Sequence, residues 1–239
     1  MLLRLMQEAR LMTIILKGGE KIIMRIPVSK ECGPYALFCL ILVVIIGYVS
    51  KELALIPGLM FLFVIYFFRN PEREIPEEEN IIVSPADGKI MDIKEIYDDS
   101  FINGHAIKVS IFLSIFNVHV NRSPISGEIK YKHYKPGKYF PAFKSHASEL
   151  NERNTIGIDN GDIKILVNQI TGFIARRIVC WVNEDDFLQK GERFGLIKFG
   201  SCTEVIVPIS VKICVKVGQV VRGGKTIIGR LPDEQIINS

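Results

Sequence analysis

Residues 205–217 read VIVPISVKICVKV, and this stretch decides the fold class of the chain. A valine or isoleucine stands at every odd position, whereas the even positions are mostly polar or small. An apolar residue at every second position predicts a half-buried β-strand, because successive side chains of a strand point to opposite faces. Pro208 has no N–H to donate to a ladder, so we expect a bend or a sheet edge at that point.

Shorter runs of the same kind lie upstream, each next to turn-forming residues. They read IIVSPADGKIMDI (81–93), HAIKVSIFLSI (105–115) and DIKILVNQITG (162–172), and no long amphipathic helix competes with them. We therefore expect residues 70–239 to form a mainly β domain, an antiparallel barrel or sandwich. Glycine turns that run into apolar strand, in SPADGKIMDI and again in QKGERFGLIKFG, are typical of barrel-sandwich-hybrid elements.

Two apolar runs precede this β region. They read PYALFCLILVVIIGYVS (34–50) and LALIPGLMFLFVIYFF (53–68), and only Lys51 and Glu52 are charged between them. A bilayer core of about 30 Å needs about 20 helical residues, so each run is short for one span and both together are too long. We predict a membrane-embedded helical hairpin over residues 34–69. The alternative is a helical pair buried in a globular core, although little else in the chain could cover it.

Charges around the hairpin predict its orientation. Six basic residues precede it and Arg69 and Arg73 follow it, whereas its tip carries only Lys51. By the positive-inside rule, both ends face the cytoplasm, and the β domain lies on the cytoplasmic side of the cell membrane. Residues 1–33 mix leucine, methionine and isoleucine with charges, which predicts an amphipathic segment on the membrane surface.

Overall composition excludes several other classes of protein. The net charge of +4 is mild, and no basic cluster is interleaved with aromatic residues. We therefore expect no nucleic-acid partner. The five cysteines are scattered and form no C-x-x-C pair, which argues against a disulfide framework and a structural zinc site. We expect a reducing compartment and no metal.

Three separate segments carry candidate chemistry. Asp87 lies in SPADGKI, His119 in SIFNVHVNRSP, and Ser201 follows Gly200 in GLIKFGSCTEV. Serine is a poor nucleophile until a base takes its proton, and a histidine oriented by a carboxylate is a common base. Taken singly, each motif also fits an ordinary turn or packing role. The neighbouring thiol of Cys202 is a weaker candidate, because adjacent strand residues point to opposite faces.

PADGKI, FNVHVNRSP and GLIKFGS, behind an N-terminal hydrophobic hairpin, together closely resemble the short form of phosphatidylserine decarboxylase. The resemblance runs from about residue 55 to 230. Members of that family are proenzymes that cleave themselves at a Gly-Ser bond. The resemblance implies Asp87 and His119 as charge-relay partners, Ser201 as the attacking group and Gly200–Ser201 as the scissile bond.

Cleavage between residues 200 and 201 would leave a β chain of 1–200 and an α chain of 201–239. The two chains would form a heterodimer, and higher oligomers stay open. Ser201 would become a covalent pyruvoyl cofactor, and no metal or dissociable cofactor would be needed. The pyruvoyl group would form a Schiff base with the lipid amine, so that phosphatidylserine yields phosphatidylethanolamine and carbon dioxide at the membrane surface.

Two alternatives stay open, and the chain departs from the long form of the family at two places. One alternative is the same chemistry on an ether-linked archaeal phosphatidylserine analogue, and the other is a non-enzymatic membrane-tethered β carrier or scaffold.

The long form has Leu-Gly-Ser-Thr where this chain has Phe199-Gly200-Ser201-Cys202, and it has a second histidine where this chain has Phe116. The proton donor after decarboxylation is therefore open, with His119 a candidate for both stages.

Overall fold

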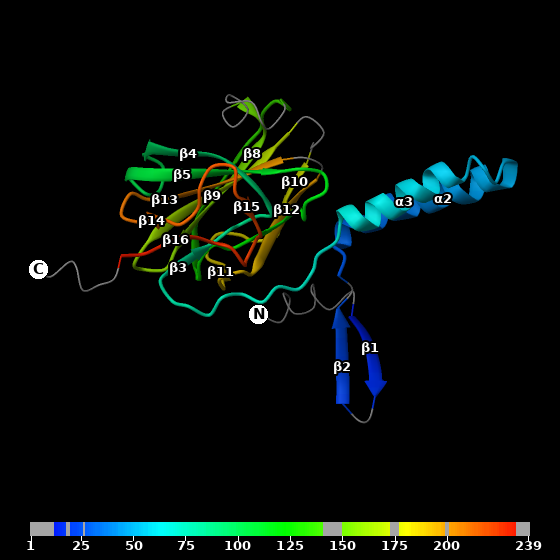
Figure 1. The fold of residues 1–239 in the computed structure, drawn as a ribbon, viewed down its shortest axis with the longest axis horizontal. Helices are drawn as coiled ribbons and strands as arrows, with labels where there is room; N and C mark the ends of the chain where they lie inside the picture. Colours follow the sequence, from blue (N-terminus) through cyan, green and yellow to red (C-terminus); the bar gives the residue numbers. More distant parts are fainter. Residues whose placement is uncertain are drawn as a thin grey trace, which may run out of the picture. The chain divides into compact units, whose positions relative to one another are not determined.

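The chain divides into two compact units, Met1–Glu72 and Arg73–Ser239, in a computed structural model (Figure 1). The structure describes residues 12–17, 20–25, 27–140, 150–172, 177–198 and 201–232.

The first unit contains a strand pair and two apolar helices. The strands β1 (Met12–Lys17) and β2 (Glu20–Arg25) are antiparallel, and a 3₁₀ turn η2 (Lys30–Cys32) leads into α2 (Gly33–Val49). A turn then leads into α3 (Leu55–Phe67), which packs against α2. Helices thus form over both apolar runs. The predicted amphipathic segment over residues 1–33 falls partly outside the described residues and includes β1 and β2.

The two helices differ in how well their length and composition suit a membrane span. Within the described residues, Lys30–Val49 is one helical stretch long and apolar enough to cross a bilayer, whereas Leu55–Phe67 is shorter. Most of the large side chains on both helices are exposed, with Tyr48 and Leu59 as examples. Exposed apolar helices are compatible with a membrane environment, and the embedded hairpin stays a prediction.

The second unit is built around a curled antiparallel sheet of eight strands within the described residues (Figure 1). Their order across the sheet is β11-β7-β8-β9-β13-β5-β4-β15. The strands are β4 (Gly88–Asp98), β5 (Gly104–Leu113), β7 (Gly127–Lys135), β8 (Arg153–Asp159), β9 (Lys164–Thr171), β11 (Phe187–Leu188), β13 (Ser201–Pro208) and β15 (Val220–Val221). This arrangement confirms the predicted mainly β, antiparallel fold class.

Two smaller antiparallel sheets complete the second unit. One has the order β10-β12-β6, and the other has the order β14-β16-β3. Their strands are β3 (Ile81–Val83), β6 (Val120–Arg122), β10 (Arg177–Cys180), β12 (Arg193–Lys198), β14 (Lys212–Ile213) and β16 (Ile227–Arg230).

The stretch 205–217 differs from the single half-buried strand that its alternation predicts. The strand β13 ends at Pro208, which confirms the expected bend, and a turn separates it from the two-residue β14. Both faces of β13 are buried, because it lies between β5 and β9 at the centre of the sheet. Val205 packs into the main core, whereas Ile206 packs on the opposite face with Phe101.

The strands of the large sheet begin and end at two opposite sides of it. Each row of strand ends is called an edge here. At one edge, here called the serine edge, β13 begins at Ser201, β5 ends at Leu113 and β9 ends at Thr171. At the other, here called the acidic edge, β4 ends at Asp98 and β8 ends at Asp159. Loops that are distant in the sequence therefore meet at each edge.

Candidate functional site

Strand pairing brings Asp87, His119 and Ser201 to the serine edge. Ser201 pairs with Leu113 of β5 on one side and with Thr171 of β9 on the other. Asp87 directly precedes β4, which is the neighbour of β5 on its far side. His119 lies in the loop that leaves β5 and enters β6. Three predicted residues from separate segments thus come to one edge of one sheet.

Backbone hydrogen bonds join the segments that carry these residues. The N–H of Arg122 donates to the carbonyl of Pro85 at 2.9 Å, which holds β6 beside the Asp87 loop. The N–H of Ile197 donates to the carbonyl of His119 at 3.1 Å, so His119 lies beside the end of β12. The chain then passes from β12 to Ser201. Gly200, on the other side of the predicted scissile bond, lies outside the described residues.

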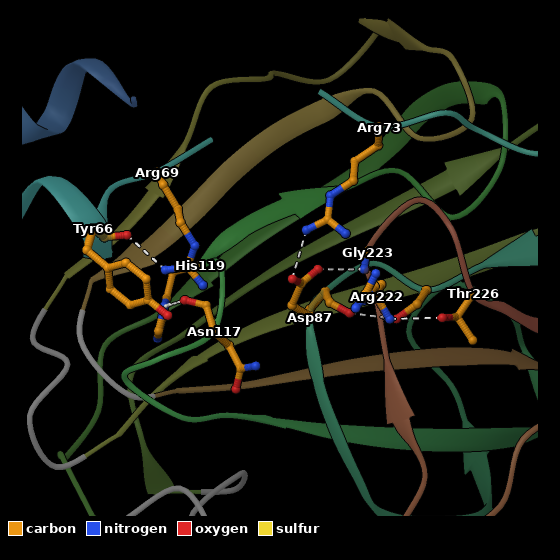
Figure 2. A network of polar contacts seen from close by, with 11 residues as sticks. Tyr66, Arg69, Arg73, Asp87, Asn117, His119, Arg222, Gly223 and Thr226 are labelled. Atoms are coloured by element: carbon orange, nitrogen blue, oxygen red, sulfur yellow. Dashed lines mark hydrogen bonds and ion pairs between the residues drawn. The ribbon is translucent and has the colours of Figure 1, made fainter. Parts of the chain in front are cut away.

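His119 is buried, with 2% of its surface exposed, and its ring is oriented by a backbone contact. Nδ1 lies 2.9 Å from the carbonyl oxygen of Asn117 (Figure 2). Because a carbonyl oxygen only accepts, Nδ1 carries the hydrogen in the neutral ring, and Nε2 is then the basic nitrogen. The Asn117 side chain fixes this loop, since its Oδ1 accepts from the Ser114 hydroxyl at 2.8 Å.

Each carboxylate oxygen of Asp87 has its own partner. Oδ2 forms an ion pair with Arg73 at 2.8 Å, and Oδ1 accepts from the N–H of Gly223 at 2.8 Å (Figure 2). The partners described for Asp87 are therefore a guanidinium and a backbone amide, whereas His119 is described with Asn117. The sequence indicated Arg73 only as a charge flanking the hairpin, and no spacing signal links it to Asp87.

Ser201 has a hydroxyl with an unusual environment. Its side chain is fully buried, and Oγ has no hydrogen-bond partner among the described residues. Leaving a buried hydroxyl unpaired costs about 1–3 kcal/mol, so such atoms in folded proteins call for a specific explanation. An unpaired Oγ is also free of bonds that would hold it away from a neighbouring carbonyl carbon.

A chain of paired polar side chains lies on the same face as Ser201. Asn121 donates to Thr203 at 2.9 Å, Gln169 donates to Asn121 at 2.9 Å, and Asn154 donates to Gln169 at 2.9 Å. Thr203 is two residues from Ser201, so strand alternation puts both side chains on one face. Buried and fully paired networks of this kind rigidify their surroundings. Sequence reasoning missed Gln169 and Asn154, because they belong to strands without a motif.

Cys202 is placed away from Ser201, as strand alternation predicts. It packs beside Ile170 on the opposite face of the sheet and is 3% exposed. Burial, and then the charge of Glu204, raise the pKa of the Cys202 thiol well above its ordinary value. A thiol with a raised pKa stays protonated at neutral pH and is a poor nucleophile.

Comparison with known proteins gives a consistent family assignment. The family model described as phosphatidylserine decarboxylase matches residues 60–229, more than half of the chain. A phosphatidylserine decarboxylase proenzyme of Carboxydothermus hydrogenoformans is 54% identical over 192 residues, which cover 80% of this chain and 90% of that protein. The proenzyme of the same name from Symbiobacterium thermophilum is 44% identical over 211 residues, covering 87% of this chain and 98% of that protein.

The family model and the relatives together define the class of the protein, a decarboxylase and therefore a lyase. The chain belongs to the phosphatidylserine decarboxylase family. The resemblance drawn from its three motifs is thereby confirmed, and the alternative of a non-enzymatic carrier or scaffold is set aside.

Proposed function

We propose that this chain is a self-processing, pyruvoyl-dependent decarboxylase that converts phosphatidylserine to phosphatidylethanolamine and carbon dioxide at a membrane surface. The observation that carries the proposal is the buried Oγ of Ser201 at the start of β13, for which no described residue provides a hydrogen-bond partner. The relatives support it, because the two proteins compared above are named proenzymes of this activity.

Processing begins with the loss of the Ser201 hydroxyl proton to Nε2 of His119. The oxygen then attacks the carbonyl carbon of Gly200, the C–N bond breaks, and the peptide becomes an ester with a free amine on Ser201. Removal of the Ser201 α-proton expels the Gly200 carboxylate and leaves a carbon–carbon double bond. Hydrolysis of the resulting enamine releases ammonia and leaves a carbonyl at the new amino end.

Asp87 contributes a negative charge beside the imidazolium that forms on His119. The hydrogen bond from Arg122 to Pro85 supports this role, because it keeps the Asp87 loop next to the strand that follows His119. Arg73 and the Gly223 amide hold the carboxylate in place through its two oxygens. The Asn117 carbonyl orients the His119 ring, so the role proposed for Asp87 is to stabilise the charged form of the ring.

The pyruvoyl group supplies a carbonyl that condenses with the substrate amine and accepts the electron pair released with carbon dioxide. The surroundings of Ser201 fit this group, because Oγ has no bond to lose and its face carries fixed polar side chains. Full burial keeps the Ser201 side chain of the uncut chain away from bulk water. The α and β chains stay together after cleavage, because β13 pairs with β5 and β9 along its length.

The membrane-surface part of the proposal rests on the loops of the serine edge. Phe116, Tyr139 and Phe140 are exposed there, and the Lys138 ammonium lies 5.8 Å from the centre of the Phe140 ring. Aromatic and basic side chains are enriched where proteins meet lipid headgroups, especially anionic ones. With basic residues on both sides of the apolar helices, the second unit faces the cytoplasm.

Intact-mass measurement of the purified full-length protein tests the proposal. We expect two polypeptides, the smaller being residues 201–239 with a carbonyl at its amino end that reacts with hydroxylamine. We also expect release of carbon dioxide from phosphatidylserine in mixed micelles. A single uncut chain that still releases carbon dioxide would overturn the self-processing mechanism, and two chains without release would overturn the activity.

A further inference from the structure

The carboxylate of Glu152 lies in the same row of the sheet as Ser201. The N–H of Thr171 donates to the Glu152 carbonyl at 3.0 Å, and Thr171 pairs with Ser201. Glu152 is two residues from Asn154, which contacts Gln169 on the Ser201 face. Because side chains alternate along a strand, Glu152 shares that face. Neighbouring strands lie about 4.8 Å apart, so the backbones of Glu152 and Ser201 are roughly 10 Å apart.

Within the described part of the chain, one of the two oxygens of this carboxylate has a hydrogen-bond partner and the other has none. Glu152 is 6% exposed, and its Oε1 accepts from the Tyr134 hydroxyl at 3.0 Å. Burial, and then the hydrogen bond to Glu152, raise the pKa of the Tyr134 hydroxyl, which keeps it a donor. Oε2 is buried and has no hydrogen-bond partner among the described residues. A buried carboxylate oxygen without a donor is costly, and the cost disappears when a cationic donor binds.

We propose that Oε2 of Glu152 accepts a hydrogen bond from the ammonium group of the lipid headgroup and so positions this nitrogen near the carbonyl formed from Ser201. This inference rests on the proposed function, which supplies an amine-bearing substrate. The amine must approach the Ser201 position, and Glu152 is a carboxylate on that face with an oxygen to which no described residue donates. The neighbouring Arg153 also has a buried, unpartnered Nε, but alternation places its side chain on the opposite face.

An ammonium group suits this oxygen better than other ligands of similar size. A carboxylate only accepts hydrogen bonds, so the headgroup carboxylate and phosphate oxygens offer it nothing. A quaternary ammonium has no N–H, so it keeps the charge attraction and loses the bond. Charge-assisted hydrogen bonds are roughly twice as strong as neutral ones, which makes the N–H a basis for discrimination. The subsite thus predicts a preference for amine headgroups over choline.

The kinetic test compares full-length wild type with Glu152→Gln, Glu152→Asp and Tyr134→Phe. We expect all four proteins to cleave themselves and to unfold at similar temperatures, since Glu152→Gln removes an unpaired charge. With short-chain phosphatidylserine, we expect Glu152→Gln to lower kcat/KM by roughly 30- to 100-fold, mainly through KM. Tyr134→Phe leaves Oε2 in place and should lower kcat/KM less than about threefold. Glu152→Asp keeps the charge, so its loss of kcat/KM should lie between those of Glu152→Gln and Tyr134→Phe.

A binding test separates the subsite from catalysis. Glycerophospho-N,N-dimethylethanolamine keeps one N–H but cannot condense with a carbonyl, and glycerophosphocholine has no N–H. By titration calorimetry, we expect wild type to prefer the dimethyl ligand by about tenfold, the worth of one hydrogen bond, and Glu152→Gln to lose that preference. Equal binding of both ligands by wild type would overturn the proposal.

The kinetic measurements can also overturn the proposed role of Glu152. A Glu152→Gln protein with wild-type KM, or failure of both Glu152 variants to cleave, would overturn the proposal, the latter because Glu152 would then serve folding or processing. Failure of the proposed function looks different, because wild type itself would be uncut or would release no carbon dioxide.

Discussion

The two edges of the large sheet are built from the same kind of strand ends, yet they satisfy their polar groups differently. At the acidic edge, Asp98 accepts from the N–H groups of Phe101 and Ile102, and Asp159 accepts from the N–H of Gly161. These carboxylates complete their own turns, as aspartate commonly does. At the serine edge, Ser201 Oγ and Glu152 Oε2 are buried without partners in the described part of the chain.

The difference supports the proposal that the serine edge carries the reaction, whereas the carboxylates of the acidic edge complete turns. Native proteins pair nearly all of their buried polar atoms, and exceptions concentrate where a reaction or a ligand needs them. Exposed aromatic side chains lie at both edges, with Phe116, Tyr139 and Phe140 at the serine edge and Tyr97 and Phe187 at the acidic edge, so the unpaired buried atoms are what distinguish the two. Substitutions matched between the two edges can therefore test this assignment.

Replacing Ser201 should have the largest effect. Ser201→Ala removes the attacking oxygen and the source of the carbonyl, so we expect one uncut chain and no measurable decarboxylation. The matched change at the acidic edge is Ser100→Ala, which removes a hydroxyl that donates to Asp98. That variant should cleave and react as wild type does. Intact mass and carbon dioxide release check both, and a cleaved Ser201→Ala chain would contradict the assignment.

Replacing His119 should slow cleavage strongly without abolishing the fold. We expect His119→Ala to lower the rate of self-cleavage by about 10²- to 10⁴-fold, the usual contribution of a general base. His105 lies near the acidic edge, at the start of β5, and its ring meets Tyr97 edge-on. His105→Ala should therefore leave cleavage unchanged. A time course after cell-free synthesis measures both rates, and equal rates would exclude His119 as the base.

Replacing Asp87 should have an intermediate effect on both cleavage and stability. Asp87→Asn breaks the largely buried ion pair with Arg73, so we expect a loss of about 1–3 kcal/mol in unfolding free energy and cleavage slowed about tenfold to a hundredfold. The control is Asp162→Asn, at an exposed turn of the acidic edge. Denaturant titration and gel analysis measure the two effects. Unchanged cleavage in Asp87→Asn would remove it from the relay.

Replacing the exposed aromatic residues of the serine edge should have the smallest effect on activity. Phe116→Ser and Phe140→Ser should lower activity on phosphatidylserine vesicles by about two- to tenfold, because partial insertion of a ring into lipid contributes little more than 1 kcal/mol. Activity on short-chain monomeric phosphatidylserine should not change. Tyr97→Ser is the control, since Tyr97 is 66% exposed and Phe116 is 62% exposed. Equal losses on both substrates would contradict membrane contact at this edge.

Local patterns in the sequence were sufficient for the fold class and for the main candidate residues. Alternation predicted strands, two apolar runs predicted helices, and three motifs pointed to Asp87, His119 and Ser201. The alternation predicted one buried face for this stretch, whereas both faces of β13 are buried. A period of two reports which side chains share a face, but it cannot report that Phe101 and its neighbours cover the second face.

Local sequence was thus sufficient to predict the strand-rich class, the apolar helices and the candidate serine, because each depends on residues close together in the chain. The pairing of Asp87 with Arg73, the place of Glu152 in the Ser201 row and their common edge became visible only in the folded chain. The Glu152 relation depends on the pairing of β9 with β13, which are distant in the chain, and the Asp87 pair depends on where the coil that carries Arg73 packs. Both are long-range contacts, and the spacing of residues within a single segment does not specify them.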